Sequence, residues 1–187
     1  MAARGDFRFN RGSLALDFTA TLGYRQGEAV ERIPTPADLD RWIAKASLAD
    51  RTAATSTDYS SALALREAIY AIGTALLEAR KPATSDVALI NAAAAARRTT
   101  QELDPKTLRI RHASKAPVRA ALAQIADDAI ALYGGPDRDR LRTCKHPECG
   151  ALMLNAARGP QRQWCSMETC GNRAKVAAYR KRRCEAT

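Results

Sequence analysis

Residues 165–183, Cys-Ser-Met-Glu-Thr-Cys-Gly-Asn-Arg-Ala-Lys-Val-Ala-Ala-Tyr-Arg-Lys-Arg-Arg, decide how the C-terminal part of this chain folds. The stretch begins with the pair Cys165 and Cys170, and an equally spaced pair, Cys144 and Cys149, lies upstream. Four thiolates in two close pairs can form a tetrahedral site around one Zn²⁺. Disulfide or redox pairing is the weaker alternative for 5 cysteines in 187 residues. We therefore predict one zinc ion bound by all four cysteines.

The segment around these cysteines has the pattern of a small zinc finger. We expect a turn at 145–148, a strand at 151–154 and a hairpin turn at 155–160. A returning strand at 161–164 and a helix at 171–183 follow. Trp164 would cover a small core with Leu152 and Leu154. A helix that begins at the last ligand is typical of a treble-clef finger, and its dipole favours a thiolate there. Because so short a segment cannot bury a sufficient core, we expect it to fold only with zinc.

The same segment is strongly basic. Residues 138–187 contain 12 Lys and Arg against 4 Asp and Glu, in a chain of formal charge +10. A basic helix can lie along phosphates and release their counterions. We expect double-stranded DNA as the partner, with Val176 turned toward the finger core. The candidate contacts are Arg162, Asn172, Arg173, Lys175, Arg180, Lys181, Arg182 and Arg183.

The expected roles differ within that set. Residues 180–183 are expected at phosphates, and Asn172 could address adenine if the helix enters a major groove. A structural role is an equal alternative for the three residues after Cys170. Gly171 would then allow a tight turn into the helix, and Asn172 and Arg173 would hydrogen-bond the cysteine turn.

The rest of the chain predicts an α+β domain. Helices are expected at 35–46, 58–80, 84–98 and 118–132, and strands at 14–18, 28–33 and 106–112. Thr35, Pro36 and Asp38 have the pattern of a capping box with proline at the first helical position. The stop signal Tyr133-Gly-Gly-Pro136 divides the chain into a body, 1–135, and a finger, 136–187.

Two charged residues interrupt apolar patterns in the body. Asp17 lies in an apolar strand pattern, and Arg66 lies in an apolar helical stripe. Buried charges are usually paired, so one hypothesis is an Asp17–Arg66 ion pair in the core. The other hypothesis is a pocket in which these residues bind an unknown anionic small molecule.

Several other classes of protein fit the sequence poorly. It has no glycine-rich phosphate loop and no nucleophile elbow, and four thiolates leave zinc no open position, so we do not expect an enzyme. We expect neither a signal peptide nor a membrane span, because no suitable apolar segment occurs. The cysteines suit a reducing cytoplasm. Neither His146 nor Cys184 is expected to bind the zinc.

Both parts of the chain resemble known families. The two cysteine pairs, with Trp164 and Gly171-Asn172-Arg173 around the second, resemble the CGNR zinc finger of bacterial proteins. The body is similar to the ABATE domain that precedes this finger, through Leu16-Asp17-Phe18 with Thr21, Asp38-Leu39 with Trp42, and Leu65-Arg66-Glu67-Ala68. Together the resemblance implies a stress-responsive transcription regulator with a DNA-binding treble-clef finger and a body that senses an unknown ligand.

The chain also departs from that pattern. Met153 and Asn155 stand where an aromatic residue and an aspartate are usual, and Arg162-Gln163 stands where two arginines are common. Ala20 replaces an expected asparagine. These changes leave the metal ligands intact, but they weaken residue-level expectations for the hairpin and for ligand chemistry in the body.

Two other functions stay open from the sequence. The basic finger could bind RNA, although Trp164 and Tyr179 are its only aromatic residues for stacking on unpaired bases. It could also be a zinc-stabilised module for protein interaction. A homodimer would suit a regulator with a single finger, but no motif indicates one.

Overall fold

A computed structural model describes residues 7–96, 100–113, 116–155 and 161–185. Its α-helices are α1 Leu14–Thr19, α2 Pro36–Lys45, α3 Ser56–Leu77, α4 Thr84–Ala94, α5 Pro117–Gly134 and α6 Asn172–Glu185. Its antiparallel strand pairs are β1 Leu22–Gly23 with β2 Val30–Glu31, β3 Thr100–Leu103 with β4 Ile110–Ala113, and β5 Leu141–Thr143 with β6 Leu152–Leu154. The expected α+β class is confirmed.

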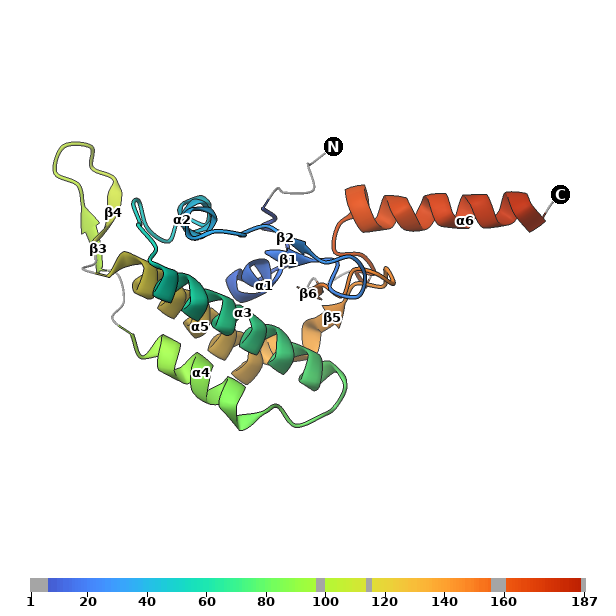
Figure 1. The fold of residues 1–187 in the computed structure, drawn as a ribbon, viewed down its shortest axis with the longest axis horizontal. Helices are drawn as coiled ribbons and strands as arrows, with labels where there is room; N and C mark the ends of the chain where they lie inside the picture. The colour runs from blue at the N-terminus through green and yellow to red at the C-terminus, as the bar shows by residue number, and fades with distance from the viewer. Residues whose placement is uncertain (1–6, 97–99, 114–115, 156–160, 186–187) are drawn as a thin grey trace.

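The body is a helical core with small strand pairs around it (Figure 1). The helices α3, α4 and α5 run side by side, α1 packs across α3 and α5, and α2 closes the same core. The apolar stripe predicted for α5 is confirmed, because its members are all buried: Val118, Leu122, Ile125, Ala129 and Leu132. A helix with so continuous a buried face is held mainly by tertiary packing.

Local sequence signals fix several helix ends. At α2, Thr35 and Asp38 form the predicted capping box and Pro36 is the first helical residue. A second capping box, Thr55 with Asp58, begins α3 slightly earlier than expected. Both boxes satisfy backbone N–H groups that a helix start leaves without partners. Residues 97–98, where we expected α4 to end, lie outside the described residues.

The strand expected at 14–18 is wrong, because this segment forms α1. Ser13 caps the helix, and Asp128 of α5 accepts hydrogen bonds from the Ser13 hydroxyl (2.6 Å) and the Ala15 N–H (2.8 Å). The helix start is therefore completed by a carboxylate far away in sequence, and short-range patterns cannot show this.

The other two expected strands are shorter than predicted. Of residues 28–33, only Val30–Glu31 forms a strand, and this strand pairs with β1. Of 106–112, only the last residues belong to a strand, because β4 begins at Ile110. The Asp104 carboxylate accepts the N–H groups of Lys106 (2.9 Å) and Thr107 (2.8 Å), which holds the preceding residues in a turn.

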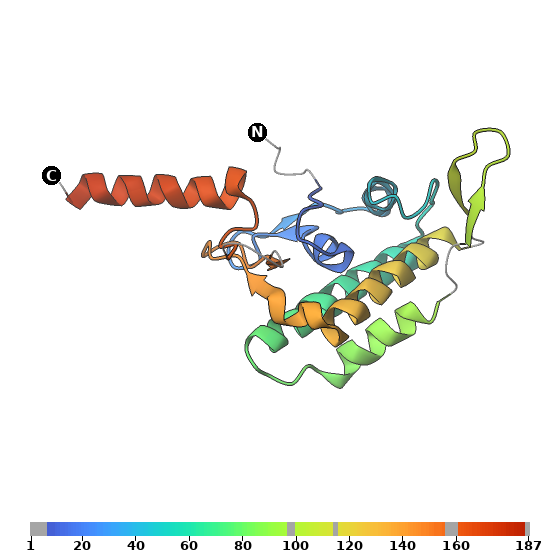
Figure 2. The ribbon, with the colours of Figure 1, turned by 180° about the vertical axis from the view of Figure 1, so that it is seen from behind.

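The finger contains the predicted strand 151–154 as β6, but its partner is β5 and not 161–164. Since β5 precedes Cys144, the first cysteine turn lies at the end of the β5–β6 hairpin. Residues 156–160 of the hairpin turn that we expected lie outside the described residues. The chain then returns to Cys165 and enters α6, which extends away from the body in both views (Figures 1 and 2).

The hairpin packs directly on the body. Backbone bonds join Arg25 N–H to the Cys149 carbonyl (3.1 Å) and Leu154 N–H to the Arg11 carbonyl (2.8 Å). The side chains of β5 and β6 share a buried cluster with α1 and α5: Leu16, Leu132, Leu141, Leu152 and Leu154. We expected Leu152 and Leu154 to form a small core under Trp164. This expectation is wrong, because both leucines pack against side chains of the body.

Candidate metal centre and nucleic-acid interface

The four predicted ligands, Cys144, Cys149, Cys165 and Cys170, form one cluster. Their sulfur atoms all lie within 4.8 Å of one another, and each cysteine is at most 5% exposed. The Cys149–Cys165 and Cys165–Cys170 sulfur separations are 3.6 and 3.5 Å. A tetrahedron with Zn–S bonds of about 2.3 Å has S–S edges of about 3.8 Å. The cluster therefore fits one zinc ion.

The electrostatics of the sulfurs also favour a cation. Hydrogen bonding with Cys144 lowers the pKa of the Cys165 thiol and raises that of Cys149. Four sulfurs this close cannot all be thiolates without strong mutual repulsion, which a central divalent cation removes. In addition, the Cys165 N–H donates to the Cys144 sulfur at 3.4 Å. This donor stabilises negative charge on the sulfur.

The alternation of β6 links the metal centre to the body. Met153 is fully buried against the cysteines, with Trp164 packed on the same cluster, whereas Leu152 and Leu154 face the body core. Successive strand residues point to opposite faces, so a single short strand serves both sites. Met153 thus packs on the metal centre while its two neighbours pack on the body.

Glycines allow close approach at both cysteine turns. Gly150 has a positive φ of 61°, and its carbonyl accepts the Tyr70 hydroxyl of α3 at 2.9 Å. A Cβ on Gly171 would come within 2.8 Å of the Met167 sulfur and 3.3 Å of Trp164. The structural role considered for Gly171 therefore agrees with the packing at the start of α6.

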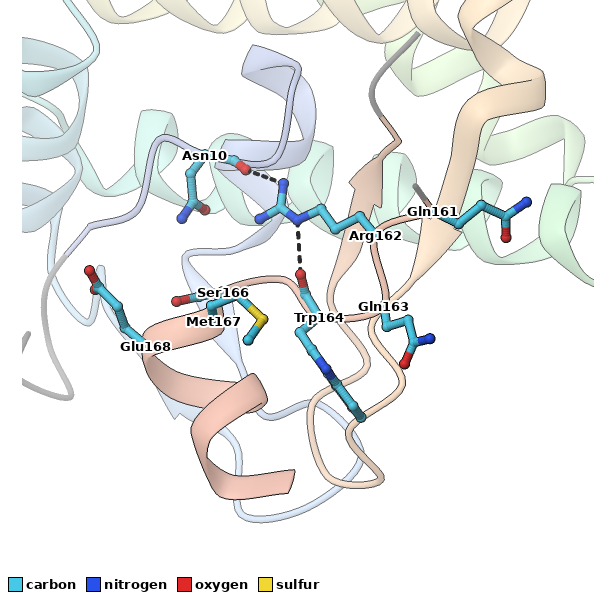
Figure 3. Close-up of a pocket in the computed structure, with 8 residues that line it drawn as sticks. All are labelled: Asn10, Gln161, Arg162, Gln163, Trp164, Ser166, Met167 and Glu168. Atoms are coloured by element: carbon cyan, nitrogen blue, oxygen red, sulfur yellow. Dashed lines mark hydrogen bonds between the residues drawn. The ribbon is translucent and has the colours of Figure 1, made fainter. Parts of the chain in front are cut away.

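Arg162 supports the cysteine loop through backbone carbonyls. Its guanidinium donates to the carbonyls of Trp164 (2.8 Å), Asn10 (2.7 Å) and Cys165, and Figure 3 shows it reaching between the first two. These contacts form one side of a cavity of about 610 Å³. Most donors of Arg162 are therefore engaged, and its expected DNA contact stays a prediction.

The two residues after Gly171 also have partners within the protein. The Asn172 amide donates to the Glu168 carbonyl at 3.4 Å, and the Arg173 guanidinium lies 4.9 Å from the centre of the Tyr24 ring. The first contact matches the structural alternative for Asn172. The second connects α6 to the body, which the sequence did not indicate. Both side chains are exposed, so neither contact removes them from a nucleic-acid surface.

The rest of α6 presents its cations to solvent. Lys175, Arg180 and Arg182 are exposed and, among the described side chains, have no hydrogen-bond or ion-pair partner. Arg183 is exposed as well, whereas the side chains of Lys181 and Cys184 lie outside the described set. Val176 is 48% exposed, so the expectation that it turns toward the finger core is wrong.

The structure does not pair Asp17 with Arg66. Arg66 donates to Glu31 (2.8 Å), Glu67 (2.8 Å) and the Thr21 hydroxyl (3.2 Å). Burial acts to lower its pKa, but the hydrogen bonds and charges of the two glutamates outweigh burial and raise it. The proposed Asp17–Arg66 ion pair is therefore wrong, because nearer carboxylates surround the arginine.

Asp17 has a different environment. One carboxylate oxygen accepts the Arg11 N–H at 2.8 Å. Burial raises the pKa of Asp17 to about 6, although the Arg11 N–H and charge act in the opposite direction. Since the two residues do not share a contact, the geometry gives no support to a ligand pocket built from both. Ligand binding by either residue stays a prediction.

Two buried arginines of the body, which no sequence pattern singled out, lie beside the metal centre. Arg11 and Arg32 are 4% and 6% exposed and line a small cavity together with Cys149, Cys165 and Cys170. Arg11 also donates to the Cys165 carbonyl at 2.6 Å. The only sequence signal was the placement of Arg32 in an otherwise strand-like segment. His146, by contrast, accepts the Glu148 N–H inside its own turn at 3.4 Å.

Fold and site together define a small α+β zinc-finger protein with an exposed basic helix. Family models match residues 12–136 to ABATE, described as a putative stress-induced transcription regulator, and residues 140–183 to the CGNR zinc finger. The chain belongs to the ABATE family and carries a CGNR finger, as the resemblance implied. These are regulator and zinc-finger families, not enzyme families.

A search of curated proteins found no match to the chain. Within the described residues, no helix combines the length and the apolar character needed to span a bilayer.

Proposed function

We propose that this protein is a zinc-dependent regulator of transcription that binds duplex DNA through α6. The observation that carries the proposal is the exposed surface of this helix, which carries cations on more than one side. It extends from the body with Lys175, Arg180 and Arg182 unpartnered among the described side chains. Cations held in this way can neutralise phosphates without breaking contacts inside the protein.

Zinc would set the direction of α6. Cys170 lies in the helical turn Met167–Gly171, which runs directly into the helix, and the other ligands lie on segments bonded to the body. The metal would therefore connect the base of α6 to the rest of the molecule. Loss of zinc would leave the basic helix without a fixed orientation, and affinity for DNA would fall because the cations are no longer held together.

Duplex DNA is favoured over unpaired RNA by the placement of the aromatic residues. Trp164 packs on the cysteine cluster and lies 3.3 Å from the position of a Gly171 Cβ. That leaves Tyr179, 55% exposed, as the one aromatic side chain of α6. Stacking on successive unpaired bases needs several such platforms, whereas exposed cations along a helix suit a phosphate backbone.

The test is fluorescence anisotropy of a labelled mixed-sequence duplex over a salt series, with zinc-loaded and chelated protein. We expect tight binding only with zinc. The double substitution Arg180→Gln/Arg182→Gln should reduce the slope of log K against log salt by about 1.8, since each phosphate contact contributes about 0.9. The control Arg51→Gln/Lys81→Gln removes equal charge from exposed loops of the body and should leave the slope unchanged.

Two outcomes would count against the proposal. Absence of duplex binding at low salt would favour a protein-interaction module. Displacement of duplex DNA by an equal amount of structured RNA would favour the RNA-binding alternative.

A further inference from the structure

Arginines dominate the space between α6 and the N-terminal part of the body. A cavity of about 830 Å³ lies there, lined by Arg8 and Arg32 of the body and by Arg173 and Arg180 of α6. Glu168 is the only carboxylate among its described lining residues. Because Arg173 and Arg180 are seven residues apart, they lie about two turns apart on the same face of the helix. Four guanidiniums from two parts of the protein therefore converge on one groove.

Arg32 is buried there without a counter-charge. It is 6% exposed, its Nη1 donates to the Ala20 carbonyl at 2.9 Å, and its Nε has no partner. Within the described part of the chain it forms no ion pair with a carboxylate. Burial, followed by the charges of Arg8 and Arg11, lowers its pKa. A buried guanidinium in this position is costly unless an anion lies nearby.

The metal centre supplies part of that negative charge. One zinc ion with four thiolates carries a net charge of −2, and Arg11 and Arg32 line the cavity beside three of the cysteines. These two arginines balance a loaded centre. The groove then retains Arg8, Arg173 and Arg180 against Glu168, so it keeps a surplus of positive charge.

We propose that this groove is a phosphate-binding site built jointly by the body and the finger. Guanidiniums suit phosphate because their planar N–H groups can bond two oxygens at once. The groove is also partly preorganised. Arg173 is held 4.9 Å from the centre of the Tyr24 ring, and Arg8 donates to the Thr169 hydroxyl at 3.4 Å. The phosphate is a diester of the DNA backbone or a group on a free small molecule.

With DNA as the source, the inference rests on the function proposed above and adds a body residue to the DNA contact. Arg8→Gln in the zinc-loaded full chain should weaken duplex binding about fivefold and reduce the salt slope by about one. Arg51→Gln is the matched control, because Arg51 is exposed and lies in the loop between α2 and α3. It should change neither quantity.

The second arm uses inorganic phosphate as the probe. Arginine Nε–H signals of the zinc-loaded, ¹⁵N-labelled chain are followed during a phosphate titration, with zinc content checked at the end point. A saturable shift at millimolar phosphate that Arg8→Gln weakens at least threefold supports the site. If phosphate also releases bound duplex, the DNA backbone and the free ion occupy the same groove.

The outcomes separate the two proposals. If the wild type binds duplex and Arg8→Gln behaves as Arg51→Gln in both arms, the groove site is overturned and the finger function stands. If no duplex binding occurs but phosphate saturates the groove in an Arg8-dependent way, the site stands with a free phosphorylated ligand as its source, and the DNA-binding function fails.

Discussion

The two halves of the C-terminal segment use arginine in opposite ways. Around the β5–β6 hairpin, arginines donate to carbonyls: Arg140 to Asn155, Arg142 to Asp139 and Leu141, and Arg162 to Asn10, Trp164 and Cys165. Along α6, the described side chains of Lys175, Arg180 and Arg182 have no such partners. The first group holds loops in place, and the second remains available to a ligand.

This difference shows that net charge overstates the binding surface. Residues 138–187 carry 12 basic against 4 acidic side chains, and the sequence treats them alike. A guanidinium bonded to several carbonyls would have to break those bonds to reach a phosphate, whereas an exposed one only exchanges water and counterions. We therefore expect substitutions in the hairpin to change stability and substitutions in α6 to change affinity.

The largest effect is expected at the metal centre. Cys165→Ser removes a ligand whose sulfur lies 3.6 Å from Cys149 and 3.5 Å from Cys170. Zinc content should fall from one per chain to nearly none, because three remaining thiolates hold the metal far more weakly. Mass spectrometry of the native protein measures the zinc content, and thermal unfolding reports the stability.

The matched control is Cys184→Ser, which removes a thiol outside the two pairs. It should keep both the zinc and the melting temperature. Since Leu152 and Leu154 join the hairpin to the body core, the cysteine variant should also lower the stability of the body. A body that melts at the wild-type temperature after loss of zinc would show that its stability does not depend on the metal centre.

The second effect concerns the shared core. Leu152 is 1% exposed, in a cluster with Leu16 and Leu132. Leu152→Ala should lower the free energy of unfolding of the whole chain by about 2–5 kcal/mol, from lost transfer energy and the cavity that remains. Urea unfolding followed by circular dichroism measures it. Val176→Ala, at a position 48% exposed, should stay within about 0.5 kcal/mol of the wild type.

A third experiment compares the two kinds of arginine directly. Arg162→Gln should reduce the free energy of unfolding by about 1.5–3 kcal/mol, because charge-assisted bonds to three carbonyls are lost. Arg162→Lys keeps the charge but not the planar fork, and should be destabilised as well. Arg182→Gln should change stability by less than about 0.5 kcal/mol and weaken duplex binding a few-fold. If Arg162→Gln left stability unchanged and Arg182→Gln lowered it, the distinction between the carbonyl-bonded arginines of the hairpin and the exposed cations of α6 would be wrong.

The metal site could be predicted from the sequence because its information is local. Two equally spaced cysteine pairs leave few arrangements other than one zinc site, and the structure brings all four sulfurs together. Capping boxes are also local, and the one at α2 was predicted to the residue. In each case the atoms that satisfy one another lie within a few positions in the chain.

The failures share the opposite property. The segment 14–18 was expected to be a strand, but it is a helix capped by Ser13, and its start is completed by Asp128, more than a hundred residues away. One hypothesis paired Arg66 with Asp17 in an ion pair, but the carboxylates that bond Arg66 are those of Glu31 and Glu67. Leu152 and Leu154 looked like the core of a finger because the sequence cannot show that the body lies against β6. Partner choice among distant charges and apolar faces depends on the assembled fold.

The smallest expected effect is the pH dependence that Asp17 adds to stability. Burial raises the pKa of this carboxyl from 3.8 to about 6 in the folded chain, with Asp128 adding to the effect and Arg11 opposing it. The folded state thus binds a proton more tightly than the unfolded state. The contribution to stability is complete below pH 3.8 and is lost as the pH rises through about 6.

Asp17→Asn tests this sign. Between pH 5.5 and 7.5 the wild type should lose on the order of 1 kcal/mol of unfolding free energy from this group, whereas the amide keeps an oxygen for the Arg11 N–H and has no proton to lose. The difference between variant and wild-type urea midpoints at the two pH values isolates it, because zinc-linked pH effects are common to both proteins. Asp139→Asn, which removes an exposed carboxylate, should follow the wild type. Parallel curves for Asp17→Asn and the wild type would mean that the carboxyl is already ionised at pH 5.5 and that Arg11 outweighs burial at this site.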